Sequence, residues 1–354
     1  MTTAEVAVLF WMDDGGHAMP GGNVTQLLKT ADALRRAGCR VTTSTSQEPD
    51  LHDVDIVHGF NLNHERVRRL RTLGIPVALS TIYWPLSFRA GARRRLPSAR
   101  EGLGRLSVGG RLAYSAFQGR YQLEAHRLSL PTRRLLMAYE SADMLLPNSR
   151  LEAEAIAREL GVSTPMSVVH NAADSRVFTR PSPGRQREGV VMAARIEPLK
   201  NQLRLIRACA ELGVDLTLIG SVHPHHRDYA HQCRRRAGRR VRFIDHAPQD
   251  GLAEVFRSAQ VHALPSWFET TGLVSLEAAL TGCAIVTTAR GYASEYFGDR
   301  AHYCQPRSVR SIKLAVESAL HDGVAPELAE TVSRLFSWEA AASATLQAYR
   351  KVLR

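Results

Sequence analysis

Short apolar runs alternate with helical patterns along this chain. Residues 6–12 form an apolar run, and residues 24–34 then place apolar side chains at the spacing of one helix face. The same order returns at residues 190–193 and 202–212, where Gly213 ends the second pattern. Strands that alternate with helices predict an α/β fold. We therefore expect two doubly wound, Rossmann-like domains that face each other across a cleft.

The remaining elements follow from similar runs and from helix-ending glycines. Further strands are expected at residues 40–44, 55–59, 75–80, 142–148, 167–170, 216–219, 241–244, 261–264 and 285–287. Further helices are expected at residues 150–160 and 254–259, from residue 273 onward, and in a final amphipathic segment that contains Trp338, Ala342, Leu346, Tyr349 and Leu353. Asn23 is the expected N-cap of the first helix.

A proline- and glycine-containing segment separates the two patterns. The sequence Pro-Ser-Pro-Gly at residues 181–184 is the clearest linker in the chain. It predicts an N-terminal domain at residues 1–178, a linker at 179–188 and a C-terminal domain at 189–335. Residues 336–354 then form the final helix.

Composition excludes several classes of protein. The hydrophobic content of 44% is typical of a globular protein, and no apolar run approaches the roughly 20 residues that span a bilayer. The apolar start lacks a basic region and a cleavage site, so we expect a strand there and not a signal peptide. The five cysteines contain no C-x-x-C pair, which favours reduced core thiols in a cytoplasmic protein.

The net charge of +12 is unevenly spread. Residues 89–134 hold eleven arginines against Glu101 and Glu124, and residues 227–242 form a second basic run. A solvated face, a nucleic-acid patch, and a surface for anionic lipid or a phosphorylated acceptor all fit such charge. No nucleic-acid-binding motif accompanies it, so we expect no nucleic-acid partner. An anionic membrane surface, at its cytoplasmic face, stays a candidate partner of this segment and of Arg93, Arg94 and Arg95.

One strand–loop–helix segment carries the strongest candidate chemistry. The apolar run 261–264 leads into a loop with Glu269 and Gly272, and Glu277 follows inside the next helix. The first amides of a helix have no internal partner, and a glycine lets an anion approach them. A diphosphate would fit there, and Glu277 could accept hydrogen bonds from two ribose hydroxyls. In the alternative interpretation, Glu269 caps the helix and Glu277 is a solvated side chain.

The residues around these two acids resemble a known family. Glu269 and Glu277 form an E-x7-E pattern that is similar to the signature of the family 4 retaining glycosyltransferases of the GT-B fold. Phe268, Gly272, Leu273, Ala278 and Gly282 also occupy positions of that pattern. The R-x4-K-N pattern at Arg195, Lys200 and Asn201 and the segment Asn171, Asp174 and Phe178 resemble other parts of the family.

The resemblance implies roles for individual residues. It implies catalytic roles for Arg195, Lys200 and Glu269, with both cations on the donor phosphates and Glu269 on the sugar hydroxyls. It implies a nucleotide-sugar site formed by Gly21, Gly22, Arg195, Lys200, His246, Thr271, Gly272, Leu273, Val274 and Glu277. The resemblance also implies that the N-terminal domain binds the acceptor and that the C-terminal domain binds the nucleotide sugar. In GT-B proteins the last helix also crosses back onto the N-terminal domain.

A metal and a cofactor are not expected. Asp53 and Asp55 have D-x-D spacing, but they lie at the entrance of a predicted strand, whereas sites in α/β folds form beyond the strand exits. The two cations and the helix amides would supply the charge that a diphosphate leaving group needs. If Glu277 holds ribose, it is not half of a carboxylate pair, so we expect front-face transfer with retention.

The chain departs from the family near the end of the strand at 75–80. Many relatives carry a donor-contacting histidine there, whereas this chain has Ser80, Thr81, Ile82 and Tyr83. His58 and His17 are candidate substitutes, although a lone histidine is more often a structural residue.

The expected activity is sugar transfer from a nucleoside-diphosphate sugar to a hydroxyl of a glycan, lipid-linked or small-molecule acceptor. Bacterial polysaccharide or glycoconjugate synthesis is the expected pathway by analogy. A GT-B epimerase, a sugar phosphorylase, and a non-catalytic nucleotide- or polyanion-binding protein remain alternatives. With four lysines, a pyridoxal-phosphate phosphorylase is the least expected of these. The sequence leaves open the sugar, the base, the acceptor and the oligomeric state.

Overall fold

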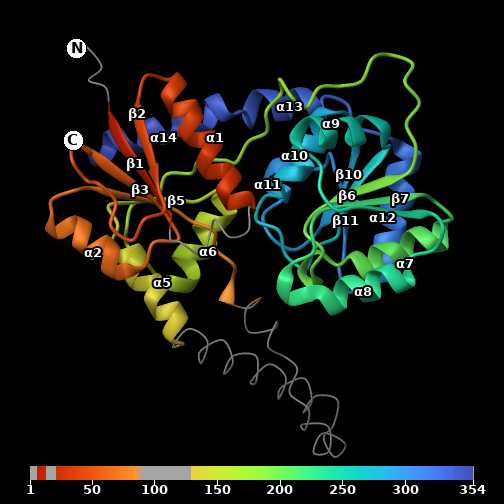
Figure 1. The fold of residues 1–354 in the computed structure, drawn as a ribbon, viewed down its shortest axis with the longest axis horizontal. Helices are drawn as coiled ribbons and strands as arrows, with labels where there is room; N and C mark the ends of the chain where they lie inside the picture. The colour runs from red at the N-terminus through yellow and green to blue at the C-terminus, as the bar shows by residue number, and fades with distance from the viewer. Residues whose placement is uncertain (1–5, 13–20, 87, 89–128, 354) are drawn as a thin grey trace, which may run out of the picture. The chain divides into compact units, whose positions relative to one another are not determined.

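The computed structural model describes residues 6–12, 21–86, 88 and 129–353. The chain divides into two compact units (Figure 1). Unit 1 comprises Met1–Leu27, Leu34–Val169 and Ala344–Arg354, and unit 2 comprises Leu28–Ala33 and His170–Ser343. Each unit is built on one sheet whose described strand pairs are parallel. The predicted α/β architecture with two parallel sheets is therefore confirmed.

Unit 1 has a five-stranded sheet in the order β2-β1-β3-β4-β5. Its strands are β1 (Ala7–Met12), β2 (Arg40–Ser44), β3 (Ile56–Phe60), β4 (Val77–Ser80) and β5 (Met144–Leu146). Its helices are α1 (Gly22–Arg36), part of which belongs to unit 2, α2 (His64–Thr72), α5 (Leu130–Ser141) and α6 (Arg150–Leu160). β1 and β3 are buried along their whole length, which is typical of central parallel strands.

Local side chains fix the ends of α6 where the sequence predicts them. Ser149 Oγ accepts a hydrogen bond from the Glu152 backbone N–H at 3.0 Å, which satisfies one of the free amides of the first turn. Gly161 follows the helix with a φ of 67°, a left-handed conformation that glycine adopts without strain.

The strand expected at residues 167–170 does not form. The backbone N–H groups of Ser167 and Val169 donate to the carbonyls of Leu145 and Pro147, but the pairing reduces to one bridge between Leu145 and Met166. Pro147 has no N–H and cannot return a bond to this segment. Pro165 likewise ends the pairing on the other side.

One expectation at the start of a helix is corrected. α1 begins at Gly22, and not after an Asn23 cap. The last residues of the arginine-rich segment are helical, because Arg133 and Arg134 lie in α5. Residues 89–128 of that segment, including Arg93, Arg94 and Arg95, lie outside the described residues.

Unit 2 has a six-stranded sheet in the order β11-β10-β9-β6-β7-β8. Its strands are β6 (Val190–Ala193), β7 (Leu216–Ile219), β8 (Val241–Ile244), β9 (Val261–Leu264), β10 (Ala284–Thr288) and β11 (His302–Cys304). Its helices are α7 (Gln202–Leu212), α8 (Arg227–Arg236), α9 (Gln249–Ser258), α10 (Leu273–Leu280), α11 (Ser294–Phe297), α12 (Val309–Asp322) and α13 (Leu328–Leu335), with 3-10 turns η3 (Pro198–Lys200) and η4 (Pro224–His226). The last helix, α14 (Trp338–Val352), has residues in both units.

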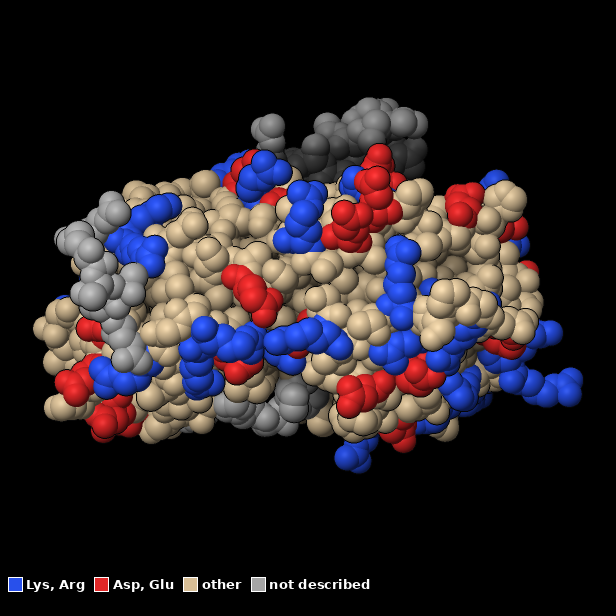
Figure 2. Space-filling model, turned by 90° about the horizontal axis from the view of Figure 1, so that it is seen from above, with Lys and Arg blue, Asp and Glu red and all other residues tan. Residues whose placement is uncertain are grey.

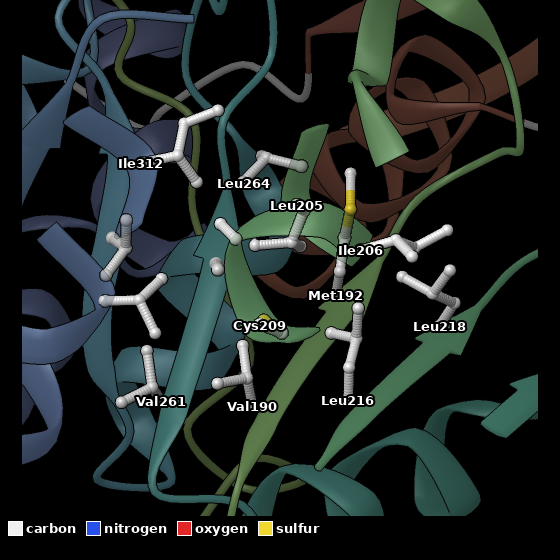
Figure 3. Close-up of a cluster of buried hydrophobic side chains, with 14 of the residues drawn as sticks. Val190, Met192, Leu205, Ile206, Cys209, Leu216, Leu218, Val261, Leu264 and Ile312 are labelled. Atoms are coloured by element: carbon white, nitrogen blue, oxygen red, sulfur yellow. The ribbon is translucent and has the colours of Figure 1, made fainter. Parts of the chain in front are cut away.

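Two apolar layers hold the unit 2 sheet. α7, α8 and α12 cover one face, and α9, α10 and α13 cover the other (Figure 1). Figure 3 shows the first layer, in which Leu205, Ile206 and Cys209 of α7 pack on strand residues such as Met192 and Leu218. Full burial of a side chain such as Leu205 contributes about 1.5–3 kcal/mol. The sheet is thus a rigid base for the loops at its carboxyl edge.

Charge is spread over the surface. Figure 2 shows lysine and arginine side chains intermixed with aspartates and glutamates on the face it presents. Among the described residues, no helix combines the length and the apolar character that crossing a bilayer requires.

Candidate functional site

Two neighbouring strands of unit 2 place the predicted site loops side by side. β6 and β9 pair in parallel, so the loops that follow them leave the same edge of the sheet. The Trp267 N–H donates to the Leu199 carbonyl at 2.9 Å, and Asn201 Nδ2 donates to the Pro265 carbonyl at 3.0 Å. The loop that carries Arg195 and Lys200 is therefore fastened to the loop that carries Glu269.

Lys200 and Glu269 are in direct contact. Lys200 Nζ donates to Glu269 Oε1 at 2.6 Å, and their side chains are 19% and 8% exposed. Charged hydrogen bonds of this length are stronger than neutral ones. The structure therefore brings together two residues that the sequence placed in one site from positions 69 residues apart.

Arg195 lies at the exit of β6 with a more open environment. Its Nη2 is 3.4 Å from Glu197 Oε1, and its side chain is 37% exposed. The Arg195 carbonyl accepts a hydrogen bond from Gln202 Nε2 at 2.8 Å, which fixes the backbone. Apart from Glu197, no described acceptor takes a hydrogen bond from the Arg195 guanidinium group, so its other N–H donors remain available.

A second loop interlocks with the backbone of Glu269. The Glu269 N–H donates to the Arg290 carbonyl at 3.2 Å, and the Glu269 carbonyl accepts from the Tyr292 N–H at 2.9 Å. Gly291 lies between these bonds with a φ of 116°, and a Cβ atom there would meet the Glu269 carbonyl oxygen at 1.9 Å. Only glycine fits this position.

α10 starts at the end of the same loop. Gly272 precedes the helix with a φ of 74°, and its carbonyl accepts the Ser275 N–H at 2.7 Å. The first N–H groups, at Leu273 and Val274, have no acceptor inside the helix. They form the electropositive end of α10, where an anion binds favourably.

Glu277 lies inside α10 and is buried. The residue is 8% exposed, and its carboxylate forms no hydrogen bond or ion pair with any described residue. Burial raises the pKa of Glu277 to about 8, an effect that the positive charge of Lys29 opposes. Burial disfavours the charged form, and the hydroxyl donors of a ligand would supply the hydrogen bonds that an ionised Glu277 needs.

The hydroxyl of Thr271 is already engaged. Thr271 Oγ1 accepts from Asn171 Nδ2 at 2.9 Å and lies 3.3 Å from the hydroxyl of Tyr296. The residue is 2% exposed. If Thr271 contacts the expected nucleotide sugar, its main chain therefore has to make that contact.

The remaining predicted site residues come from other segments of the chain. His246 is exposed and follows β8, an edge strand that β7 separates from β6. Gly21 and Gly22 belong to unit 1, where they form the start of α1. His17 lies outside the described residues.

Of the two interpretations of His58, the structural one agrees with the structure. It is 1% exposed inside the unit 1 sheet, where its Nδ1 is 2.6 Å from the Tyr349 hydroxyl and its Nε2 is 2.8 Å from Ser80 Oγ. Burial lowers the pKa of His58 to about 3. His58 therefore joins β3, β4 and α14 and is enclosed, so it is no substitute for a sugar-contacting histidine.

The D-x-D pair of unit 1 has the structural role expected of it. Asp55 Oδ2 accepts a hydrogen bond from the Ala7 N–H at 2.7 Å, at the amino end of β1. Asp53 has a φ of 53° and pairs with His52 at 3.1 Å.

Glu152, which the sequence did not single out, organises the carboxyl edge of unit 1. Its Oε1 accepts from the Thr81 hydroxyl at 2.8 Å and from the Tyr83 N–H at 2.7 Å, and its Oε2 accepts from the Asn148 N–H at 2.9 Å. Asn148 Oδ1 also accepts from Gln26 Nε2 of α1 at 2.7 Å. The only sequence signal was the position of Glu152 three residues after the Ser149 cap.

Unit 2 thus presents cations, a free helix start and a buried carboxylate within two adjacent loops and one helix. Cations and amides stabilise phosphate charge, and a carboxylate accepts hydroxyl hydrogen bonds. The chemistry fits a nucleoside diphosphate that carries a polar group.

Comparisons with known proteins agree with this chemistry. Residues 179–334 match the family model described as glycosyl transferases group 1. D-inositol 3-phosphate glycosyltransferase of Kribbella flavida is 30% identical over 254 residues, which cover 62% of this chain and 60% of that protein. A second such protein, from a Nocardioides species, is matched over 54% of its length. The chain thus spans little more than half of these curated relatives.

Solved structures share the fold over nearly the whole chain. Sucrose-phosphate synthase from Thermosynechococcus elongatus has a TM-score of 0.75 and 17% identity, with 98% of this chain and 99% of that chain covered. Anabaena HepE in complex with UDP-glucose has a TM-score of 0.72 and 16% identity, with 98% and 100% covered. Identities this low establish the fold alone. The chain adopts the GT-B fold, and its residues 179–334 match the family model of the group 1 glycosyl transferases.

Proposed function

We propose that this protein is a retaining glycosyltransferase that moves a sugar from a nucleoside-diphosphate sugar to a hydroxyl acceptor. The observation that carries the proposal is Glu277, a buried carboxylate without a partner among the described residues, one helix turn from a free helix start. A ribose has two adjacent hydroxyl donors that match such an acceptor. Its diphosphate would extend toward the amides of α10.

Arg195 and Lys200 would hold the diphosphate. A nucleoside diphosphate leaves with its negative charge, so fixed cations at the β-phosphate stabilise the transition state. Charged hydrogen bonds contribute about 1.5–3 kcal/mol each. Lys200 would then lie between the phosphate and Glu269, its partner at 2.6 Å. This arrangement needs no metal, and we propose none.

Glu269 would position the donor sugar. Its second oxygen, Oε2, is free to accept sugar hydroxyls while Oε1 accepts from Lys200. With Glu277 on the ribose, no second carboxylate is proposed at the reacting carbon. We therefore propose front-face transfer with retention, in which the β-phosphate assists deprotonation of the acceptor.

Acceptor and pathway follow by analogy. The relative from Kribbella flavida is named for D-inositol 3-phosphate, and we propose a glycan, lipid-linked or small-molecule acceptor in polysaccharide or glycoconjugate synthesis. A peripheral association with an anionic membrane remains part of this proposal.

Two measurements test the function. A thermal-shift screen against UDP-, GDP- and ADP-sugars should find a donor, because a ligand well above its Kd raises Tm. Donor turnover should then require an acceptor, and Glu277→Ala should raise the donor KM while Arg195→Ala lowers kcat. Donor conversion without an acceptor would support an epimerase, and binding without turnover would support a non-catalytic protein.

A further inference from the structure

A second basic cluster lies at the carboxyl edge of unit 2. The guanidinium carbon of Arg204, in α7, lies 5.1 Å from the centroid of the Trp267 ring, and that of Arg307 lies 6.0 Å from it. These distances are typical of cation–π contacts. One indole ring therefore contacts two arginine side chains from segments more than 100 residues apart.

Asn201 fastens the three segments of this cluster together. Asn201 is 1% exposed, and its Nδ2 donates to the Pro265 carbonyl at 3.0 Å and to the Pro306 carbonyl at 2.9 Å. Its Oδ1 accepts from Arg204 Nη1 at 3.1 Å. Trp267 and Arg307 each follow one of these prolines within two residues. The cluster is therefore built on a fixed backbone and not on a freely moving surface.

The two guanidinium groups lack a countercharge. Within the described part of the chain, no carboxylate forms an ion pair with Arg204 or Arg307. The nearest functional carboxylate in sequence, Glu269, already pairs with Lys200. Two like charges near one ring repel each other, and an anion bound at the cluster would reduce that repulsion. Stacking leaves the in-plane N–H groups of a guanidinium available for a planar fork of hydrogen bonds.

The cluster adjoins the proposed diphosphate site without sharing its residues. The Trp267 N–H donates to the carbonyl of Leu199, which directly precedes Lys200. Arg195 and Lys200 have their own acids, Glu197 and Glu269.

We propose that Arg204, Trp267 and Arg307 form a second oxyanion site, beside the diphosphate site, that binds a phosphate or carboxylate group of the acceptor. The assignment of this group to an acceptor rests on the proposed function, whereas the site itself rests on the cluster. An acceptor that carries such a group is then favoured over the same molecule without it.

Trp267 provides the signal for the test. Indole fluorescence is recorded while inorganic phosphate is added to the whole protein, first alone and then with UDP at saturation. We expect a saturable change in both titrations, and its loss in Trp267→Phe identifies the reporting ring. Glucose 6-phosphate should produce the same change, and glucose should not.

Variants decide whether the cluster is responsible. The double variant Arg204→Gln/Arg307→Gln should bind phosphate at least tenfold more weakly, while Arg310→Gln, at an exposed arginine of α12 three residues after Arg307, should stay within twofold of the wild type. Arg204→Lys/Arg307→Lys keeps the charge without the planar fork and should recover only part of the affinity. Unchanged Tm values in these variants exclude unfolding as the cause.

Three results would overturn the inference: no phosphate binding, equal binding by the double glutamine variant, or complete displacement of phosphate by UDP, which would make the cluster part of the donor site. The proposed function is tested separately by the thermal-shift screen of nucleotide sugars. UDP binding with no phosphate binding removes only the second site, and phosphate binding with no binding of any nucleotide removes the proposed function.

Discussion

Lys200 donates a hydrogen bond from its ammonium group to Glu269 Oε1 at 2.6 Å, so the cation proposed for the donor phosphates and the acid proposed for the donor sugar form one ion pair. The pair holds both side chains at the carboxyl edge of unit 2. Its removal should affect catalysis and stability together, and the two effects can be separated.

Lys200→Ala should reduce turnover by roughly 10- to 100-fold, since a charged contact of about 1.5–3 kcal/mol is lost. It also leaves the buried Glu269 carboxylate unpaired, which should destabilise the protein by about 1–3 kcal/mol. Denaturant unfolding and steady-state kinetics measure the two effects. In Lys200→Ala/Glu269→Gln we expect stability to recover in part while turnover stays low, and turnover that recovers with stability would argue against a phosphate role for Lys200.

Glu277→Gln should stabilise the apo protein at alkaline pH. The native pKa of Glu277, about 8, lies above its ordinary value of 4.5, so the folded state holds this proton more tightly than the unfolded state. The stability from that proton is present below pH 4.5 and is lost as pH rises to 8. Glutamine does not titrate, so Tm should exceed that of the wild type by a few degrees at pH 8 and match it near pH 5.

The same variant should lose its response to nucleotide. A glutamine side chain offers one acceptor oxygen where the carboxylate offers two, so ribose binding weakens. The Tm increase produced by a saturating nucleotide should therefore shrink at both pH values. An unaltered nucleotide response in Glu277→Gln would separate Glu277 from the donor.

Gly291→Ala should disturb the loop that carries Glu269. An added Cβ would meet the Glu269 carbonyl oxygen at 1.9 Å, and the φ of 116° is unfavourable for alanine. We expect destabilisation by about 2 kcal/mol or more and a higher donor KM. Gly238→Ala is the matched control, because no atom lies within 4 Å of its added Cβ. If the two substitutions had equal effects, the loops would accommodate the added Cβ of Gly291→Ala beside Glu269 without a loss of stability.

Glu152→Gln should loosen the carboxyl edge of unit 1. An amide in place of the carboxylate would direct its NH2 group at a backbone N–H or a hydroxyl that now donates to Glu152. We expect the free energy of unfolding to fall by about 1–3 kcal/mol. Hydrogen exchange should accelerate at residues 81–86. Exposed Glu154, on the same α6, provides the control Glu154→Gln, which should leave exchange unchanged. If exchange at residues 81–86 stayed slow in Glu152→Gln, contacts other than those of Glu152 would hold these residues in place.

The sequence predicted strands best where an apolar run has clear boundaries. The predicted bounds of β7 and β8 agree with the structure, because each run ends at a glycine or an acid. The strand expected at residues 167–170 was wrong, because Pro147 and Pro165 remove the donors that a ladder needs. An apolar run indicates that a segment is buried. Whether that segment pairs in a sheet depends on its partner strand, which the position of the run in the sequence does not reveal.

The sequence predicted individual site residues better than it predicted the contacts between them. Lys200 and Glu269 were both expected beyond strand ends, but their pairing depends on β6 and β9 being neighbours, which is a property of sheet order. The cluster at Trp267 escaped prediction for the same reason, since Arg204 and Arg307 belong to distant segments. For His58 the structural interpretation, which is the commoner one for a lone histidine, agrees with the structure, because the ring is enclosed.

The fit of Gly291 against the Glu269 carbonyl restricts how this protein can be re-engineered or can diversify. The loop after β9 and the loop after β10 are shaped to each other at the level of single atoms, so neither can be transplanted from a relative by itself. A chimera with altered donor preference would have to exchange both segments at once, and natural variation in one should be inherited together with variation in the other.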